Sequence, residues 1–323
     1  MLPDYSMNVH KKLEQKGCGG FSPRNSHTSK GVRLIMKTRT GNFPIGFISG
    51  GLGPDARDLE GLIAWAKESD LEVIDGVAPE QVKSVQAAGL RVGTIGLQGS
   101  RGLISPDKDK RADAIAACAE YIRANATLGP MNYMVVMAPE DPNRQRSENF
   151  GYLVESYGAL VPALEESKGR ISIEGYPAPG ALCCTPETLR ALFKEIPSKA
   201  MGINFDPSHL VRMGIDHLRF LREFGARVVH VHGKDTELLT ENFYDFGMEQ
   251  PPTFAKRIPF GSICWRYAIP GHGVVRWTEA FRILQSAGYA GCVSIELEDA
   301  NFTSSPGERK LGILQGARFL TGC

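Results

Sequence analysis

The sequence lacks three features that would assign it to a special class: a cysteine pattern, a long apolar run and an excess of charge. Its seven cysteines are odd in number and contain no Cys-x-x-Cys pair, which argues against a disulfide framework and against a zinc site built from cysteines. No apolar run approaches the roughly 20 residues of a membrane span, and the N-terminal stretch lacks the apolar centre of a secretory signal. We therefore predict a soluble protein in a reducing compartment, with a cytoplasmic location.

Charge is balanced over the chain as a whole but not along it. The net charge is +1, with 42% hydrophobic and 23% charged residues, as in an ordinary globular protein. Residues 1–40, however, contain eight lysines and arginines and only two acidic residues, so the remainder is net acidic. We predict that residues 1–40 form a disordered basic extension, either a targeting or nucleic-acid arm or a dispensable tail upstream of an alternative start at Met36. An acidic body argues against nucleic acid as a partner.

From Pro44 onward, apolar runs alternate with amphipathic segments. Strands are predicted near residues 45–49, 71–77, 91–97, 133–138, 171–174, 202–206, 228–232 and 292–296. Helices are predicted at residues 58–68, 79–88, 107–128, 151–167, 186–195, 216–224, 277–287 and 306–320. This alternation favours a (β/α)8 TIM barrel that forms a single domain over residues 41–323.

One connection interrupts the alternation. About forty residues separate Asp235 from Trp277, where two to six are usual. The segment follows the seventh strand at its carboxyl end, on the face where such barrels place their active sites. We interpret it as a lid or substrate-covering insert, with a subunit contact in a homo-oligomer as the alternative. Its aromatic residues are Phe243, Tyr244, Phe246, Phe254, Phe260, Trp265 and Tyr267.

Polar side chains gather at the carboxyl ends of the last four predicted strands. They are Glu174 on the fifth strand, Asp206 and His209 on the sixth, His230, His232, Lys234 and Asp235 on the seventh, and Glu296, Glu298 and Asp299 on the eighth. Side chains two residues apart in a strand point to the same face, so one residue of each His and Glu pair lies deeper in the barrel. Two Glu, one Asp and one His that converge there predict a mostly oxygen site for one divalent metal with open positions for a substrate. Mn²⁺ is our first choice, with Mg²⁺, Co²⁺ and Zn²⁺ as alternatives.

The same strand ends carry motifs that can be compared with a known family. The motifs are IEGYP, NFDPSHL, HVHGKD and SIELED, together with a PGHG loop around His272. From about Pro44 to Leu320 the chain resembles the xylose isomerase-like TIM-barrel superfamily, in particular its sugar (phosphate) isomerase/epimerase branch, which includes ketose 3-epimerases.

The resemblance implies roles for particular residues. It implies one metal held by Glu174, Asp206, His232 and Glu296. It also implies that His209 contacts the substrate and that Asp235 matches an acidic residue three positions after the metal-binding histidine. Ketose 3-epimerases carry an arginine six positions after that histidine, where this chain has Leu238, and this departure argues against a free ketose as substrate.

The chemistry of such a site fits proton transfer next to a carbonyl. Removal of that proton creates an enediolate, and a metal on the carbonyl and hydroxyl oxygens takes up its charge. We predict that Glu174 and Glu296 act as base and acid on opposite sides of the sugar while they also bind the metal. The expected enzyme is a sugar isomerase or epimerase that acts on a sugar or keto-sugar through a metal-bound enediolate, with a small carbohydrate as its partner and neither nucleic acid nor membrane.

Three further residues are predicted to contact the substrate. Lys234 would neutralise an oxyanion or phosphate, unless it pairs with Asp235 or Glu298. His272, between two glycines, would carry a proton, unless it is an exposed turn residue. Gln98, at the end of the third strand, would bond a sugar hydroxyl or complete a turn.

Three other functions compete with this prediction. A metal-dependent lyase on 3-keto-glycosides would use the same enediolate and expel a leaving group. An apurinic-site endonuclease shares the barrel and the Glu, Asp-x-x-His and His elements, but it uses three metals and needs histidines at the early strand ends, where this chain has Val77 and Gln98. A sugar-binding barrel without catalysis is the third, and the intact pair of glutamates argues against it.

Overall fold

The computed structural model describes residues 35–323. Most of the predicted basic extension therefore lies outside the described residues. Its last residues are hydrogen-bonded to the barrel, since Met36 N donates to Asp70 O over 2.8 Å and Thr40 N donates to Cys323 O over 2.7 Å. Residues just before the predicted boundary at 41 thus contact the barrel.

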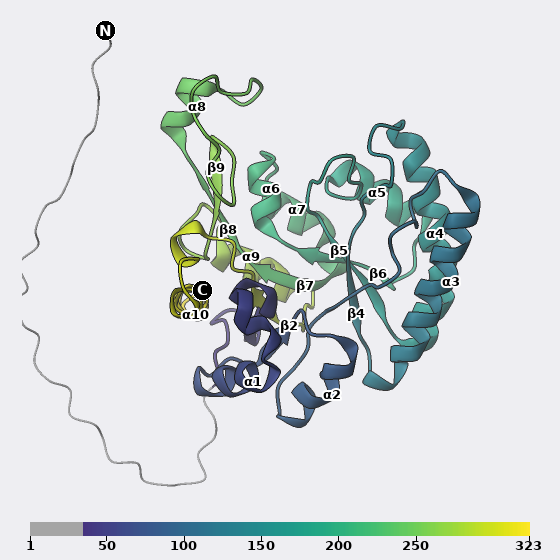
Figure 1. The fold of residues 1–323 in the computed structure, drawn as a ribbon, viewed down its shortest axis with the longest axis horizontal. Coiled ribbons are helices and arrows are strands. Elements are labelled where there is room, and N and C mark those ends of the chain that lie inside the picture. Colours follow the sequence, from purple (N-terminus) through teal and green to yellow (C-terminus); the bar gives the residue numbers. More distant parts are fainter. Residues whose placement is uncertain (1–34) are drawn as a thin grey trace, which may run out of the picture. The chain divides into compact units, whose positions relative to one another are not determined.

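Eight parallel strands form one sheet that curls into a nearly closed barrel (Figure 1). They are β1 (Ile45–Ile48), β2 (Val73–Asp75), β3 (Ile95–Gly96), β4 (Asn132–Val136), β5 (Arg170–Glu174), β6 (Met201–Phe205), β7 (Val228–Gly233) and β10 (Val293–Ile295). The order is β2-β1-β10-β7-β6-β5-β4-β3, and a parallel bridge from Val73 to Arg91 brings the segment before β3 back beside β2. The predicted (β/α)8 TIM barrel is confirmed.

Each predicted helix is present and follows one of these strands in sequence. They are α1 (Leu59–Glu68), α2 (Pro79–Ala87), α3 (Lys108–Ala124), α4 (Arg146–Ser167), α5 (Pro186–Glu195), α7 (His217–Phe224), α9 (Trp277–Ser286) and α10 (Pro306–Thr321). Short 3-10 helices are η1 (Ser49–Arg57), η2 (Asn125–Leu128), η3 (Gly225–Arg227) and η4 (Ala300–Phe302). Helix α4 begins at Arg146 rather than at residue 151, because its buried face already includes Asn149 and a glycine at 151 is tolerated in the second turn.

One short helix was not predicted and lies next to the site. Helix α6 (Pro207–Arg212) follows β6 directly. Asp206 caps it, since its side chain accepts a hydrogen bond from Ser208 N, and Pro207 occupies the first helical position, where no backbone N–H is needed. This turn brings His209 and Arg212 back over the end of β6.

The apolar residues of strands and helices form one buried core. The six cysteines in the described part of the chain are all free and buried, as a chain without a disulfide framework requires. None of the helices within residues 35–323 has the length and apolar character that crossing a membrane would need.

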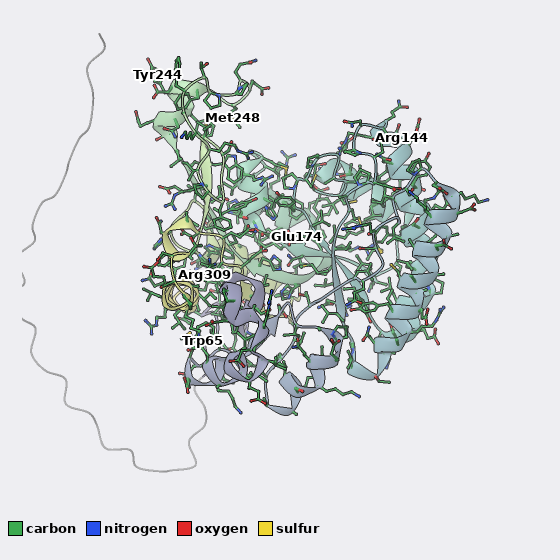
Figure 2. The ribbon with its side chains drawn as sticks, in the orientation of Figure 1. Trp65, Arg144, Glu174, Tyr244, Met248 and Arg309 are labelled. Atoms are coloured by element: carbon green, nitrogen blue, oxygen red, sulfur yellow. The ribbon has the colours of Figure 1, made fainter. Side chains whose placement is uncertain are left out.

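The long insert after β7 contains secondary structure of its own. β8 (Asp235–Leu238) and β9 (Trp265–Ala268) pair antiparallel, and helix α8 (Thr240–Phe246) lies between them. The insert extends away from the barrel in Figure 1, and Figure 2 shows Tyr244 and Met248 at its far end, remote from Glu174. Tyr244 is 90% exposed, whereas Tyr267 in β9 is 4% exposed. The insert therefore has an exposed tip and a base that is buried against the barrel mouth.

Candidate metal centre

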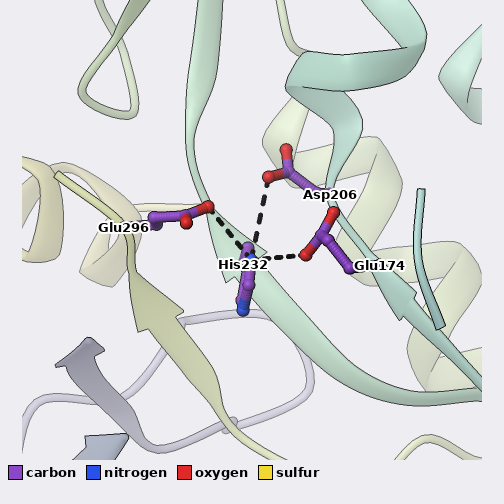
Figure 3. Close-up of side chains that lie close together, drawn as sticks. All are labelled: Glu174, Asp206, His232 and Glu296. Carbon is purple, nitrogen blue, oxygen red and sulfur yellow. Dashed lines mark ion pairs between the residues drawn. The ribbon is translucent and has the colours of Figure 1, made fainter. Parts of the chain in front are cut away.

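Four side chains meet at the carboxyl end of the barrel. Glu174, Asp206, His232 and Glu296 each offer one ligand-type atom, and these atoms all lie within 4.8 Å of one another. Nδ1 of His232 lies 2.9 Å from Glu174 Oε2, 3.1 Å from Glu296 Oε2 and 3.7 Å from Asp206 Oδ2 (Figure 3). The strands β5, β6, β7 and β10, which are neighbours in the barrel, thus each place one candidate ligand at their carboxyl end.

The donor set fits a divalent cation. Asp206 and His232 are 4% and 0% exposed, so both are removed from water. Glu174 Oε1, Asp206 Oδ2 and both ring nitrogens of His232 have no hydrogen-bond partner within the described residues. Buried carboxylates without donors are unfavourable unless a positive charge lies among them. Three carboxylates and one imidazole around one point are ligands of the kind that Mn²⁺, Mg²⁺, Co²⁺ or Zn²⁺ takes.

The electrostatics of the centre keep its acids charged. Burial raises the pKa of Glu296, but attraction to Lys234 and His232 outweighs it and lowers the pKa to about 2. Burial also raises the pKa of Glu174, and attraction to His232 and to the neighbouring His209 again brings it well below its usual value. Burial lowers the pKa of His232, whereas Glu296 and Glu174 raise it well above its usual range. A proton on His232 offsets the same negative charge of the carboxylates that a bound metal ion would offset.

Two neighbours orient the acidic ligands, and the sequence patterns did not reveal them. Ser208 donates from both its N and its Oγ to Asp206 Oδ1, over 2.9 and 2.6 Å, which leaves Oδ2 to face the centre. The Asn204 side chain donates to Glu174 Oε2, and the two residues are register partners on β6 and β5. The helix cap is a signal that could have found Ser208, whereas Asn204 depends on the register of the sheet.

Lys234 lies inside the carboxylate cluster. Its Nζ lies 2.6 Å from Glu296 Oε2, 3.0 Å from Glu298 Oε2 and 3.1 Å from Asp206 Oδ2, and the residue is 1% exposed. Burial lowers its pKa, but Asp206, Glu296 and Glu298 raise it well above the usual value. The predicted alternative of an ion pair with Glu298 is therefore present, and the pair with Asp235 is not among its contacts.

His209 also reaches the centre. Its Nε2 lies 3.2 Å from Glu174 Oε1 and 3.3 Å from Asp206 Oδ2, and the residue is 2% exposed. Its other ring nitrogen, Nδ1, lies 2.7 Å from the hydroxyl of Tyr267. The structure thus brings His209 to two of the four residues of the centre, and the substrate contact that the resemblance implies stays a prediction.

Asp235 holds the two ends of the insert together. It is fully buried, and its Oδ1 accepts from the backbone N of Thr236 and Val275 over 2.8 and 3.0 Å. Its Oδ2 accepts from Gly271 N and from the indole of Trp277, both over 3.1 Å. These four donors use the hydrogen-bonding capacity of the carboxylate, so its contacts are structural and none reaches the centre.

His272 and Gln98 are both exposed. The ring of His272 has Phe302 as its aromatic neighbour, at 6.3 Å between ring centroids. The side chain of Gln98 makes no hydrogen bond to any residue from 35 to 323. A substrate contact for either residue stays a prediction.

His230 lies one layer below His232, as strand alternation predicts. Its Nε2 lies 3.0 Å from Asp75 Oδ2, and Ser294 Oγ donates to the same oxygen over 2.5 Å. The other oxygen of Asp75 accepts from the backbone N of Gly93 and Thr94. His230 therefore belongs to a polar layer in the barrel interior directly beneath the centre, with its ring centroid 5.5 Å from that of His232.

Fold and site together define a (β/α)8 barrel whose carboxyl end carries an acidic centre of the kind that binds a divalent metal. A family model described as "Xylose isomerase-like TIM barrel" matches residues 59–323. The chain belongs to this family, which confirms the resemblance.

Similarity to individual proteins is partial. The chain is 34% identical over 143 residues to "Uncharacterized protein YfiH" of Bacillus subtilis, which covers 44% of each chain. It is 30% identical over 138 residues to inosose dehydratase of Geobacillus thermodenitrificans, which covers 43% of this chain and 44% of the relative. Both alignments span less than half of the relative's length.

The solved structure of D-psicose 3-epimerase from Clostridium cellulolyticum H10 superposes with a TM-score of 0.63. The match covers 87% of this chain and 100% of that one at 14% identity, which shows a shared fold.

Proposed function

We propose that this protein is a divalent-metal-dependent enzyme that isomerises or epimerises a sugar or keto-sugar through an enediolate. The observation that carries the proposal is the placement of Glu174 and Glu296. Figure 3 shows them on either side of His232, and an Oε2 of each lies about 3 Å from the same Nδ1, at 2.9 and 3.1 Å.

Two carboxylates on either side of a bound substrate suit transfer of a proton between its faces. One glutamate would remove the proton from the carbon next to the carbonyl, and the other would return a proton to that carbon or its neighbour. Each such group contributes about 10²- to 10⁴-fold to the rate. Attraction to Lys234 and His232 lowers the pKa of Glu296 to about 2, so this side chain is ionised at neutral pH, as a group that removes a proton must be. A divalent cation held by Glu174, Asp206, His232 and Glu296 would supply electrostatic stabilisation of the negative charge that develops.

Donors beside the centre suit a substrate rich in oxygen atoms. Lys234 Nζ and His209 Nε2 both border the carboxylate cluster, and we assign them to hydroxyl or carbonyl oxygens of the substrate. Family membership and the names of the similar proteins, which refer to an inosose and to D-psicose, support a small polyhydroxylated ketone. Among metals, Mn²⁺ remains our first choice for this oxygen-rich set.

A lyase is the second candidate, and the inosose dehydratase relative is the observation that favours it. Elimination and epimerisation both begin with removal of the proton next to the carbonyl. In elimination the enediolate then expels the oxygen substituent of the next carbon as the leaving group. The glutamate that has removed the proton from carbon can return it to the departing oxygen, so the elimination releases water or an alcohol.

Deuterium exchange separates the two reactions. We would incubate the Mn²⁺-loaded protein in D₂O with keto-sugars, an inosose and a 3-keto-glycoside, and follow each by NMR. Deuterium next to the carbonyl together with a new stereoisomer supports isomerisation or epimerisation, and loss of water or of the glycosidic group supports the lyase. Glu174→Gln and Glu296→Gln should abolish either reaction, whereas the exposed Glu195→Gln on α5 should not. Absence of exchange with every substrate in the metal-loaded protein would contradict both candidates.

A further inference from the structure

The insert contributes a side chain to the candidate site. Tyr267 lies in β9, opposite Thr236 of β8, and is 4% exposed. Its hydroxyl oxygen lies 2.7 Å from His209 Nδ1 and 2.5 Å from Arg212 Nη1. Tyr267 therefore connects the insert to the histidine that borders the metal centre.

The chemistry of these three groups fixes the direction of the hydrogen bonds. A guanidinium has only donors, so Arg212 donates to the Tyr267 oxygen. The hydroxyl has one hydrogen of its own, and His209 Nδ1 is its hydrogen-bond partner within the described residues. A nitrogen that accepts a hydrogen bond carries no hydrogen, so a neutral His209 has its hydrogen on Nε2. That nitrogen faces the centre, 3.2 Å from Glu174 Oε1 and 3.3 Å from Asp206 Oδ2.

We propose that Tyr267 is a positioning residue that fixes His209 as the tautomer with its hydrogen on Nε2. The insert thereby completes the site, because a substrate oxygen bound at the centre then faces the N–H of His209 Nε2. In the other tautomer it would face a lone pair on that nitrogen. The identity of that oxygen as part of a sugar rests on the proposed function, whereas the tautomer itself does not.

Arg212 is held in place by aromatic rings. Its guanidinium carbon lies 4.7 Å from the ring centroid of Trp265 and 5.1 Å from that of Tyr176, and its Nη2 donates to Pro177 O over 3.3 Å. No carboxylate lies within ion-pair distance of Arg212 in the part of the chain that the structure describes. With no acid to attract it elsewhere, the guanidinium directs a hydrogen at Tyr267.

The base of the insert is also anchored to the barrel. Asp299 accepts hydrogen bonds from Arg266 Nη1 over 3.1 Å and from Ile269 N over 3.2 Å. These two donors precede and follow Tyr267 in the sequence. Asp235 ties the start of the insert to its end, as described above. Tyr267 thus comes from a fixed wall of the site, and the interpretation of the insert as a lid applies only to its tip.

Nitrogen NMR on the full chain tests this inference. In protein labelled with ¹⁵N-histidine, long-range ¹H–¹⁵N correlations distinguish a protonated ring nitrogen from an unprotonated one, and His209→Asn assigns the signals. We expect wild-type His209 to show unprotonated Nδ1 and protonated Nε2. Tyr267→Phe, which keeps the ring and removes the hydroxyl, should shift this pattern to a mixture of tautomers, whereas Tyr244→Phe at the exposed tip should leave it unchanged.

A hydrogen on Nδ1 in the wild type would overturn the inference, and so would an unaltered His209 pattern in Tyr267→Phe. Arg212→Met provides a second variant, because it removes the donor to Tyr267 and leaves the tyrosine free to accept from His209. We expect it to move the His209 signals in the same direction as Tyr267→Phe, and unchanged signals in it would count against the inference as well.

Activity provides an independent measurement once a substrate is known. Loss of one hydrogen bond that orients a substrate contact should lower kcat/KM of Tyr267→Phe by about tenfold, with the metal content unchanged. If no substrate is turned over, the proposed function fails while the tautomer measurement still stands. If turnover is found but the tautomer is wrong, only the role of Tyr267 fails.

Discussion

The ammonium of Lys234 lies 2.6 Å from Oε2 of Glu296, one of the four candidate metal ligands. A fixed positive charge thus shares the carboxylate cluster with the position of the metal ion. The lysine offsets part of the negative charge of Glu296, Asp206 and Glu298, so the cluster can stay ionised before a metal binds.

Metal content is the first prediction. The purified protein should bind about one divalent metal per chain, as a single set of four ligands implies. Asp206→Asn and His232→Ala should lose it, because each removes one of the four ligands, and elemental analysis measures the loss. Exposed Glu195→Gln is the matched control and should keep the metal. About three zinc atoms per chain would support the endonuclease alternative, and no metal would contradict the centre.

Metal binding should also stabilise the fold. An ion that binds only the folded state at 100 times its Kd adds about 2.7 kcal/mol to the free energy of unfolding. We expect the Tm of the metal-free protein to rise on addition of Mn²⁺ and to fall again with a chelator. Asp206→Asn should show no such response, and an equal response in that variant would place the metal elsewhere.

Lys234→Met should destabilise the metal-free protein. The substitution leaves Asp206, Glu296 and Glu298 without their shared cation, and breaking a buried ion pair in this way costs about 3–5 kcal/mol. Urea unfolding would measure the change. Lys194→Met on the exposed face of α5 is the control and should stay within about 0.5 kcal/mol of the wild type. Equal stabilities of the two variants would show that the pairs contribute nothing.

The low pKa of Glu296 predicts a dependence of stability on acid pH. Its pKa is about 2 in the folded protein against an ordinary 4.5, so ionised Glu296 contributes stability above pH 4.5 that is lost as the pH falls towards 2. In metal-free protein, the free energy of unfolding should therefore fall more steeply with acid for the wild type than for Glu296→Gln. Parallel curves for the two proteins would contradict the lowered pKa.

Asp235→Asn separates a structural role from a substrate contact. In this variant an amide nitrogen replaces one carboxylate oxygen and faces two N–H groups whose hydrogen bonds that oxygen now accepts. Depending on the orientation of the amide, these are the N–H groups of Gly271 and Trp277 or those of Thr236 and Val275. The expected loss is about 1–3 kcal/mol of unfolding free energy, with the metal content retained. A variant as stable as the wild type but without turnover would instead support the substrate contact that the resemblance implies.

The sequence by itself determined the barrel and the strand ends at which the candidate ligands lie. Strands and helices of a (β/α)8 barrel are local patterns of apolar residues, and each can be recognised without knowledge of its neighbours. The same patterns place Glu174, Asp206, one of His230 and His232, and one of Glu296 and Glu298 at strand ends that meet on one face of a parallel barrel. The choice of His232 and Glu296 within these pairs followed from the family resemblance.

Tertiary structure alone decided what surrounds these ligands. The pairing of β8 with β9 joins residues 235–238 to residues 265–268 across a long loop, and no local pattern specifies that register. This pairing places Tyr267 beside His209, whereas the register of β5 and β6 places Asn204 beside Glu174. The position of Lys234 among three acids likewise depends on the arrangement of strand ends that are far apart in sequence. Hydrogen bonds and ion pairs between residues far apart in sequence depend on distances of a few ångströms, which only the folded chain sets.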